Sequence, residues 1–413
     1  MLRFYNIIAS KIRFCKRELF DIYFAVTHRK IKFELGLQAG RKRVLLIRLD
    51  NIGDFVLWLD AFEKFLEMYP SSEYEVTVLG NEAWKDLAIS TGASCKWFFL
   101  NTSRFLLDMP YRLKTLAEIR NRNFHIAIQT RYSRRYALED AIIRTCGAKE
   151  RIGFGSHSGS LKKVEHLRSR RWYTRLVQTS QENIHELERN AEFVRNVTGT
   201  NARPSFPKLQ VREDALVTVR GLLGSTEALD YYVIFIGSAD AGKKWPISKY
   251  MQVVTRMSSQ FVWAGIICSG PEEGAAAEAL KSFSKSILHN FVGRTDLVTL
   301  AAIISQAKFV LTNDTMAVHM AAAVGVPSVC ILGGGHFGRF IPYPRLDEPG
   351  YFRPTPVFVK MPCYGCNWHC VYPRMKDEPY KCISDISVES VLHAITKVVS
   401  SCLKKQGSAA CRE

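Results

Sequence analysis

The chain has 413 residues, a formal net charge of +18 and a hydrophobic content of 47%. These values exclude a disordered, collagen-like or coiled-coil protein and leave room for roughly two to three globular domains. The positive charge is compatible with an anionic membrane surface or an anionic small molecule as a partner, or with a basic surface that only aids solubility. We expect no nucleic-acid partner, because no zinc-finger, RRM or repeat signature accompanies the charge.

Targeting signals and membrane spans are not expected from the sequence. The first residues carry charges and have neither an uninterrupted apolar stretch nor a small-residue cleavage site, which argues against a signal peptide. Residues 315–338 lack Asp, Glu, Lys and Arg, but Gly-Val-Pro and three consecutive glycines predict two short elements there. The eleven cysteines are odd in number, and several lie in apolar runs, which predicts reduced thiols in a cytoplasmic protein.

Residues 1–40 form a basic segment. Apolar residues recur at helical spacing between Phe4 and Ile22, and Arg13 and Arg17 fall on the opposite face. A basic amphipathic helix of this kind can lie in a membrane interface that carries anionic lipid, which would place the protein peripherally on the inner membrane. The alternative is a surface helix whose apolar face packs on the body of the protein.

From residue 41 the sequence alternates strand and helix patterns. Apolar residues at helical spacing over 55–66 predict a helix that ends near Pro70. The strands predicted on either side cover residues 44–48, 75–79 and 125–129. This βαβ pattern is typical of a parallel, doubly wound sheet, and it predicts a Rossmann-like domain over residues 41–200.

The pattern restarts after residues 199–212, which contain two prolines and no periodicity and therefore predict a connection between domains. Residues 247–257 have a helical pattern. The predicted strands of this half cover residues 232–236, 263–268, 309–311 and 328–332. We expect a second Rossmann-like domain over residues 213–400, with ligands bound at the carboxyl ends of the strands in the cleft between the domains.

The first candidate motif is Arg-Leu-Asp-Asn-Ile-Gly-Asp at residues 48–54, directly after a predicted strand. Gly53 permits a tight strand-to-helix turn, and Asp54 stands at the start of the helix. A carboxylate there can accept a proton from a substrate hydroxyl. The alternative is an N-cap aspartate, whose charged form the helix terminus stabilises. Spacing alone favours the cap.

The second candidate motif runs from Ile236 to Pro246 and also joins a strand to a helix. Glycines, the hydroxyl of Ser238 and the cations of Lys243 and Lys244 suit a phosphate group. The spacing is not that of a P-loop. The alternative is a solvated basic turn.

The third candidate motif covers residues 312–319 and opens an Ala-rich helix. The free N–H groups of the loop and Thr315 can hold a pyrophosphate. Asp314 is a candidate cap for this helix, and His319 is more simply explained as a packed polar residue.

The order and spacing of these motifs resemble glycosyltransferase family 9, the bacterial ADP-heptose:lipopolysaccharide heptosyltransferases and their relatives. The resemblance extends from about residue 43 to about residue 399. The residues that carry it are RLDNIGD at 48–54, KKWP at 243–246, GRTDL at 293–297, NDTMAVHMAAAVGVP at 313–327 and CISDISVESV at 382–391.

This resemblance implies an α/β protein with the GT-B fold, that is, two Rossmann-like domains facing a cleft. It implies a metal-independent, inverting reaction with no cofactor. By the resemblance, Asp54 matches the general base. The positions that it assigns to the nucleoside-diphosphate sugar are Ser238 and Lys243 on the phosphate loop, Glu272 at the ribose, and Asp314 and Thr315 under the diphosphate. We add Lys244 as a second candidate cation for the departing diphosphate.

Departures from the family pattern leave the donor sugar and its nucleotide open. Met316 and Ala317 stand where Gly-Pro is usual, and residues 332–339 replace the usual Phe-Gly-Pro segment. Within that segment, His336 and Arg339 are candidates for reading a different donor.

The segment 363–382 carries cysteines at positions 363, 366, 370 and 382, with the spacing C-x2-C-x3-C-x11-C. Four thiolates of Cys363, Cys366, Cys370 and Cys382 can in principle hold zinc or an iron–sulfur cluster. Only one C-x2-C pair is present, so we favour the alternative of reduced thiols in a loop near the cleft and expect no metal.

We therefore expect a glycosyltransferase that moves heptose or another sugar from a nucleoside diphosphate to lipopolysaccharide core, O-antigen or another lipid-linked glycan. A GT-B-fold nucleotide-sugar epimerase is one alternative. A catalytically degenerate glycan- or nucleotide-binding scaffold is another; Met316-Ala317 favours it, and the intact Asp54 and Lys243 argue against it.

Overall fold

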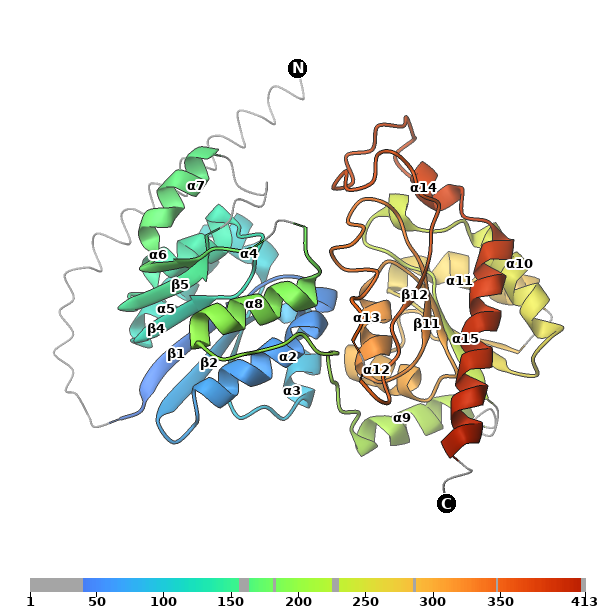
Figure 1. The fold of residues 1–413 in the computed structure, drawn as a ribbon, viewed down its shortest axis with the longest axis horizontal. Helices are drawn as coiled ribbons and strands as arrows, with labels where there is room; N and C mark the ends of the chain where they lie inside the picture. The colour runs from blue at the N-terminus through green and yellow to red at the C-terminus, as the bar shows by residue number, and fades with distance from the viewer. Residues whose placement is uncertain are drawn as a thin grey trace.

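The computed structural model describes residues 40–155, 163–180, 183–224, 230–284, 287–346 and 348–409. Two α/β domains lie side by side, each built on a parallel six-stranded sheet (Figure 1). The predicted fold class is therefore confirmed. The amphipathic helix predicted near the N-terminus lies outside the described residues.

The first sheet has the strand order β3-β2-β1-β4-β5-β6. Its strands are β1 (Lys42–Arg48), β2 (Tyr74–Asn81), β3 (Lys96–Leu100), β4 (Ile126–Gln129), β5 (Glu150–Phe154) and β6 (Arg175–Val177). Its helices are α2 (Ile52–Met68), α3 (Lys85–Ser90), α4 (Thr102–Leu107), α5 (Met109–Asn121), α6 (Ala141–Thr145), α7 (Lys163–Ser169) and α8 (Glu186–Thr198), with a π-helix at Tyr136–Asp140 and 3-10 turns at Glu82–Trp84 and Arg170–Trp172.

The second sheet has the strand order β12-β11-β10-β7-β8-β9. Its strands are β7 (Tyr231–Phe235), β8 (Ala264–Cys268), β9 (Leu288–Asn290), β10 (Val310–Asn313), β11 (Ser328–Ile331) and β12 (Thr355–Val357). Its helices are α9 (Glu213–Leu223), α10 (Ile247–Ser258), α11 (Gly274–Phe283), α12 (Leu297–Ser305), α13 (Met316–Ala323), α14 (Lys381–Ser384) and α15 (Val388–Ala409), with 3-10 turns at Ala241–Lys243 and Pro271–Glu273.

Both faces of each sheet are covered, which explains why the central strands are uninterrupted apolar runs. In β1, Val44 and Leu46 belong to the apolar cluster that contains α2, whereas Leu45 and Ile47 belong to a separate cluster that contains α5. All four side chains are fully buried. Alternation of side chains along the strand therefore sends successive residues to opposite layers of helices.

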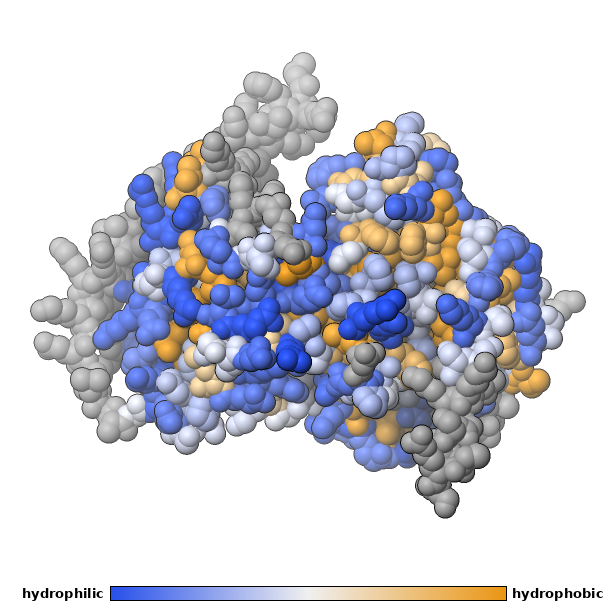
Figure 2. Space-filling view, viewed as in Figure 1, coloured by the Kyte–Doolittle hydropathy of each residue, from blue (hydrophilic) through white to orange (hydrophobic). Residues whose placement is uncertain are grey.

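The two domains meet where β1 leads into α2 and β10 leads into α13. A Cβ atom built on Gly53 would lie 3.1 Å from the His319 ring and 3.4 Å from the Cα of Met316, so the two helix starts are in close contact. Residues of both domains share one buried apolar cluster, to which Phe55 and Ala317 belong. On the face drawn in Figure 2, hydrophilic residues predominate where the domains meet. The carboxyl ends of the central strands thus face one shared region.

Within the described part of the chain, every helix is too short or too polar to span a bilayer.

Candidate active site

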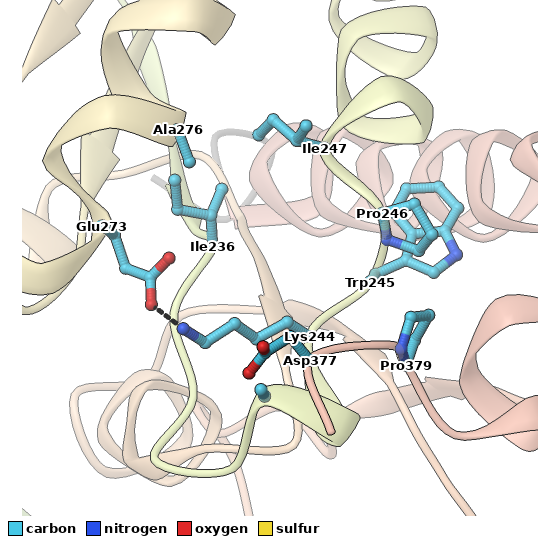
Figure 3. A pocket seen from close by; sticks show the side chains of 10 residues that line it. Ile236, Lys244, Trp245, Pro246, Ile247, Glu273, Ala276, Asp377 and Pro379 are labelled. Carbon is cyan, nitrogen blue, oxygen red and sulfur yellow. Dashed lines mark ion pairs between the residues drawn. The ribbon is translucent and has the colours of Figure 1, made fainter. Parts of the chain in front are cut away.

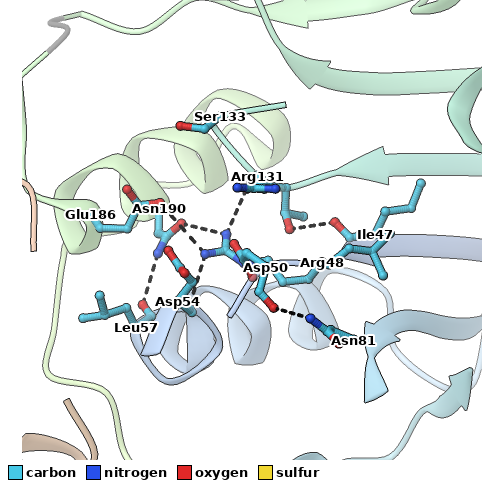
Figure 4. A network of polar contacts seen from close by, with 12 residues as sticks. Ile47, Arg48, Asp50, Asp54, Leu57, Asn81, Arg131, Ser133, Glu186 and Asn190 are labelled. Carbon is cyan, nitrogen blue, oxygen red and sulfur yellow. Dashed lines mark hydrogen bonds and ion pairs between the residues drawn. The ribbon is translucent and has the colours of Figure 1, made fainter. Parts of the chain in front are cut away.

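The first part of the site is the turn between β1 and α2, which Arg48 holds in shape. The guanidinium of Arg48 is fully buried, and its Nε donates to Asp50 Oδ1 at 3.0 Å. Its terminal nitrogens donate to the backbone oxygens of Thr130 at 3.1 Å and of Asp54 at 3.0 Å (Figure 4). A buried cation needs such partners to offset its desolvation. Arg48 therefore fixes the turn at Asp50, where it begins, and at Asp54, where α2 is already formed.

Asp54 is the third residue of α2 and is half-buried. Asn51 occupies the N-cap position, so the alternative that made Asp54 the cap is wrong. From the sequence, the helix terminus was expected to lower the pKa of Asp54 and so make it a weaker base, but the structure gives the opposite direction. Burial raises the pKa of Asp54 above its usual value of 3.8, against the opposing effect of Arg48. A carboxylate with a raised pKa accepts a proton more readily at neutral pH, as a general base must.

Charged residues from both domains surround Asp54. Glu186, the first residue of α8, is buried and forms ion pairs with Arg339 at 3.4 Å and with Arg48 at 3.9 Å. Arg339 belongs to the second domain and also donates to Ser133 Oγ at 3.1 Å in the first. Arg339 therefore joins the two domains close to Asp54, and its role in reading the donor stays a prediction.

The second part of the site is the loop between β7 and α10, and Asn313 holds it. Asn313 ends the neighbouring strand β10 and is fully buried. Its Nδ2 donates to the Ile236 carbonyl oxygen at 2.7 Å. Its Oδ1 accepts from the Trp245 backbone N–H and from the Tyr250 hydroxyl, each at 3.1 Å. One amide side chain thus joins the beginning and the end of the predicted phosphate loop.

Replacing Asn313 by alanine is expected to lower the free energy of unfolding by about 2 to 4 kcal/mol, because each buried group left unpaired costs about 1–3 kcal/mol. Denaturation in urea measures this change. The control is Gln252→Ala, which removes an exposed amide from α10 and is expected to cost less than about 0.5 kcal/mol. Equal costs for the two variants would contradict the role given to Asn313.

The two lysines of the predicted phosphate loop point in different directions. Lys243 places its Nζ over the ring of Trp368, 4.1 Å from the centroid. Lys244 instead forms an ion pair with Glu273 in a pocket of about 380 Å³ (Figure 3). The charge of Lys244 is therefore already balanced by a carboxylate. Among the described residues, Lys243 forms no ion pair within 4.0 Å, although it lies close enough to Asp314 to oppose the rise in the pKa of that carboxyl. Ser238, on the same loop, is half-buried.

The third part of the site is the turn between β10 and α13. Thr315, and not Asp314, caps α13, because its Oγ1 accepts from the Ala317 backbone N–H at 3.4 Å. Asp314 is half-buried; burial raises its pKa above 3.8, and nearby Lys243 opposes this rise. Met316 and Ala317, where the family has Gly-Pro, form the first turn of the helix. The departure in sequence therefore leaves the helix start intact.

Glu272 lies in the 3-10 turn after β8 and is exposed. Its carboxylate folds over Gly270, since a Cβ atom there would meet both carboxylate oxygens. His336 accepts a hydrogen bond from Trp368 Nε1 at 3.2 Å, and burial and the positive Arg339 and Lys243 lower its pKa to about 4. His336 is therefore neutral at physiological pH.

The family model of glycosyltransferase family 9 (heptosyltransferase) matches residues 112–348, which is more than half of the chain. The chain belongs to glycosyltransferase family 9. No curated protein matches the sequence.

Solved structures agree with this assignment at the level of the fold. A family 9 glycosyltransferase from Veillonella parvula DSM 2008 is 17% identical with a TM-score of 0.69, over 87% of this chain and 98% of the other. The E. coli ADP-heptose lipopolysaccharide heptosyltransferase II is 14% identical with a TM-score of 0.66, over 87% and 99%. The E. coli heptosyltransferase WaaC with ADP-2-deoxy-2-fluoro heptose is 15% identical with a TM-score of 0.60, over 86% and 99%.

The four cysteines of segment 363–382 in this family 9 glycosyltransferase differ in burial. Cys363, Cys366 and Cys370 are half-buried and Cys382 is buried. In the described residues, no three His, Cys, Asp or Glu side chains are grouped so that they could hold a metal ion. The contacts of this segment with the predicted phosphate loop include two aromatic residues, Trp368 and Tyr380, and the ion pair of Arg374 with Asp240.

The sequence analysis did not predict the roles of three residues in the site of this glycosyltransferase: Arg48, Glu186 and Asn313. A charged residue at the end of an apolar strand was the available signal for Arg48, because a buried charge requires partners. Asn313 gave the same kind of signal at the end of β10. Glu186 gave none, since its partners lie far away in the chain.

Proposed function

We propose that this family 9 glycosyltransferase transfers the sugar of an ADP-sugar, heptose or another, onto a hydroxyl of lipopolysaccharide core, O-antigen or another lipid-linked glycan. The observation that carries the proposal is the contact between Gly53 and Met316, which brings the turn of Asp54 against the start of α13. Structural relatives named for ADP-heptose and for lipopolysaccharide support the choice of donor and acceptor.

Asp54 is proposed as the general base on the acceptor side. It is half-buried, its pKa is raised by burial, and the turn that carries it is fixed through Arg48. In the reaction, the acceptor oxygen forms a bond to the anomeric carbon, the bond to the diphosphate breaks, and the acceptor proton goes to Asp54. A single displacement of this kind passes through an oxocarbenium-like state and inverts the anomeric centre.

The donor side is proposed to stabilise the departing diphosphate without a metal ion. Lys243 supplies a positive charge, and the first backbone N–H groups of α13 supply hydrogen-bond donors at the positive end of a helix. Charge of this kind acts where negative charge develops in the transition state. Ser238 and Glu272 complete the proposed donor site, at the phosphates and the ribose.

A panel of ADP, GDP, UDP and dTDP in isothermal calorimetry tests the donor half of this proposal. We expect one nucleoside diphosphate, ADP by the structural relatives, to bind. Lys243→Ala is expected to weaken its affinity by about 10- to 100-fold, the effect of losing a hydrogen bond to a charged group.

Lys244→Ala is the matched control, because the neighbouring lysine is already paired with Glu273. It is expected to change the affinity by less than about three-fold. Equal losses in the two variants, or no binding of any nucleotide by the wild type, would contradict the proposed donor site.

A further inference from the structure

The segment that carries the cysteines packs directly on three consecutive glycines. A Cβ atom on Gly333 or Gly335 would collide with the ring of Trp368, and one on Gly334 would collide with the ring of Tyr364. The backbone N–H of Asn367 also donates to the Gly335 carbonyl oxygen at 3.0 Å. Only glycine leaves room for two aromatic rings so close to the backbone. The backbone of Gly333–Gly335 therefore forms the surface against which Trp368 packs, and we call this surface the glycine floor.

Trp368 is held in an uncommon backbone conformation. Asn367 has φ 51° and Trp368 has φ 63°, so two consecutive non-glycine residues adopt the left-handed region. Residues in this region are strained and persist only where the surroundings fix them. Here the indole N–H donates to His336 Nδ1 at 3.2 Å while the ring lies on the glycine floor. The orientation of the indole is thus set by several independent contacts.

A second aromatic residue from the same segment fixes the phosphate loop itself. Tyr380 donates its hydroxyl to Asp240 Oδ2 at 2.9 Å and its backbone N–H to the Gly242 carbonyl oxygen at 2.7 Å. The rings of Tyr380 and Trp368 lie 5.1 Å apart. Loop residues 240–243 are therefore bordered by two aromatic rings, one of which lies under the Lys243 ammonium group.

We propose that Trp368 is a positioning residue for Lys243, and that it holds the ammonium group ready for the diphosphate of the donor. The proposal rests on the donor site described under the proposed function. A π face attracts a cation but accepts no conventional hydrogen bond from it and carries no net charge. The ring therefore holds the Lys243 ammonium in place and leaves its N–H donors free for phosphate oxygens. The pairing of Lys244 with Glu273 shows the contrasting case, in which a carboxylate neutralises the cation.

A double-mutant cycle measured as ADP affinity by calorimetry tests this proposal. Trp368→Leu removes the ring face and is expected to weaken ADP binding by about three- to ten-fold, whereas Trp368→Phe keeps a ring and is expected to stay within about two-fold. In the Lys243→Ala background, Trp368→Leu is expected to have no further effect, because its partner is gone. Tyr364→Leu is the control, since it loosens the same segment from the same glycine floor.

Fluorinated tryptophan gives a second measurement that does not depend on the folding of Trp368→Leu. Fluorine withdraws electron density from the ring face and weakens its attraction for a cation. Incorporation into the wild type is expected to weaken ADP binding. Incorporation into Trp368→Phe, which retains the other six of the seven tryptophans, is expected to leave it unchanged.

Three results would overturn the proposal: an equal effect of Trp368→Leu with and without Lys243, an equal effect of Tyr364→Leu, or no effect of fluorination in the wild type. A different result would overturn the donor site itself. If Lys243→Ala binds ADP as tightly as the wild type does, the proposed function loses its phosphate-binding lysine.

Discussion

Replacing Asp54 by asparagine is expected to lower kcat by about a thousand-fold, within the range that general-base catalysis supplies. Donor affinity is expected to stay the same, because the proposed donor contacts come from the other domain. The control is Glu67→Gln, which removes an exposed carboxylate from the same helix α2. A value of kcat within ten-fold of the wild type for Asp54→Asn would remove this residue from the role of base.

The pH dependence of kcat/KM in the wild type also tests whether Asp54 acts as the general base. Asp54 accepts a proton only when it is ionised, so kcat/KM falls as the pH drops through its pKa. Because burial raises that pKa above 3.8, the acidic limb is expected at a higher pH than for an exposed aspartate. The residual activity of Asp54→Asn is expected to lack this limb. The measurement is the pH profile of kcat/KM for both proteins.

Replacing Arg48 by methionine is expected to lower the free energy of unfolding by about 3 to 5 kcal/mol, the cost of breaking a buried ion pair. The change leaves the buried carboxylates of Asp50 and Glu186 without this cation. Denaturation in urea measures the loss. The double variant Arg48→Met with Asp50→Asn is expected to recover part of it, because one of the stranded charges is removed.

Arg104→Met is the matched control for Arg48. Arg104 pairs with Asp108 at 3.1 Å on the surface, where the arginine side chain is 60% exposed. Exposed pairs contribute about 0–1 kcal/mol, so a small change is expected. If Arg48→Met unfolds at the same urea concentration as Arg104→Met, the buried guanidinium does not hold the turn of Asp54 in the way described.

The strands at the centre of each sheet could be predicted because burial on both faces leaves a clear apolar run. Residues 44–48 and 232–236 were expected as strands, and β1 and β7 occupy nearly the same residues. Strands nearer the sheet edges, such as β3 and β6, were not predicted. They are short and partly polar, so their sequences lack a distinct pattern.

The site could be predicted as a set of loops, but the role of each side chain could not. The spacing of the motifs favoured Asp54 and Asp314 as helix N-caps, whereas the structure has Asn51 and Thr315 as the N-caps of α2 and α13. Shifts of one to three residues depend on backbone dihedral angles that single residues do not determine. The contact between Lys243 and Trp368 joins residues far apart in the sequence, and it exists only because the fold brings their loops together.

Acceptor-dependent release of nucleoside diphosphate tests the central claim most directly. The purified wild type is incubated in EDTA with ADP-, GDP-, UDP- or dTDP-sugars, with and without a lipid-linked glycan extract, and free nucleoside diphosphate is measured. We predict release from one donor, only when the acceptor is present. Release that is equally fast without the acceptor would contradict the account of a transferase whose base, Asp54, acts on an acceptor hydroxyl.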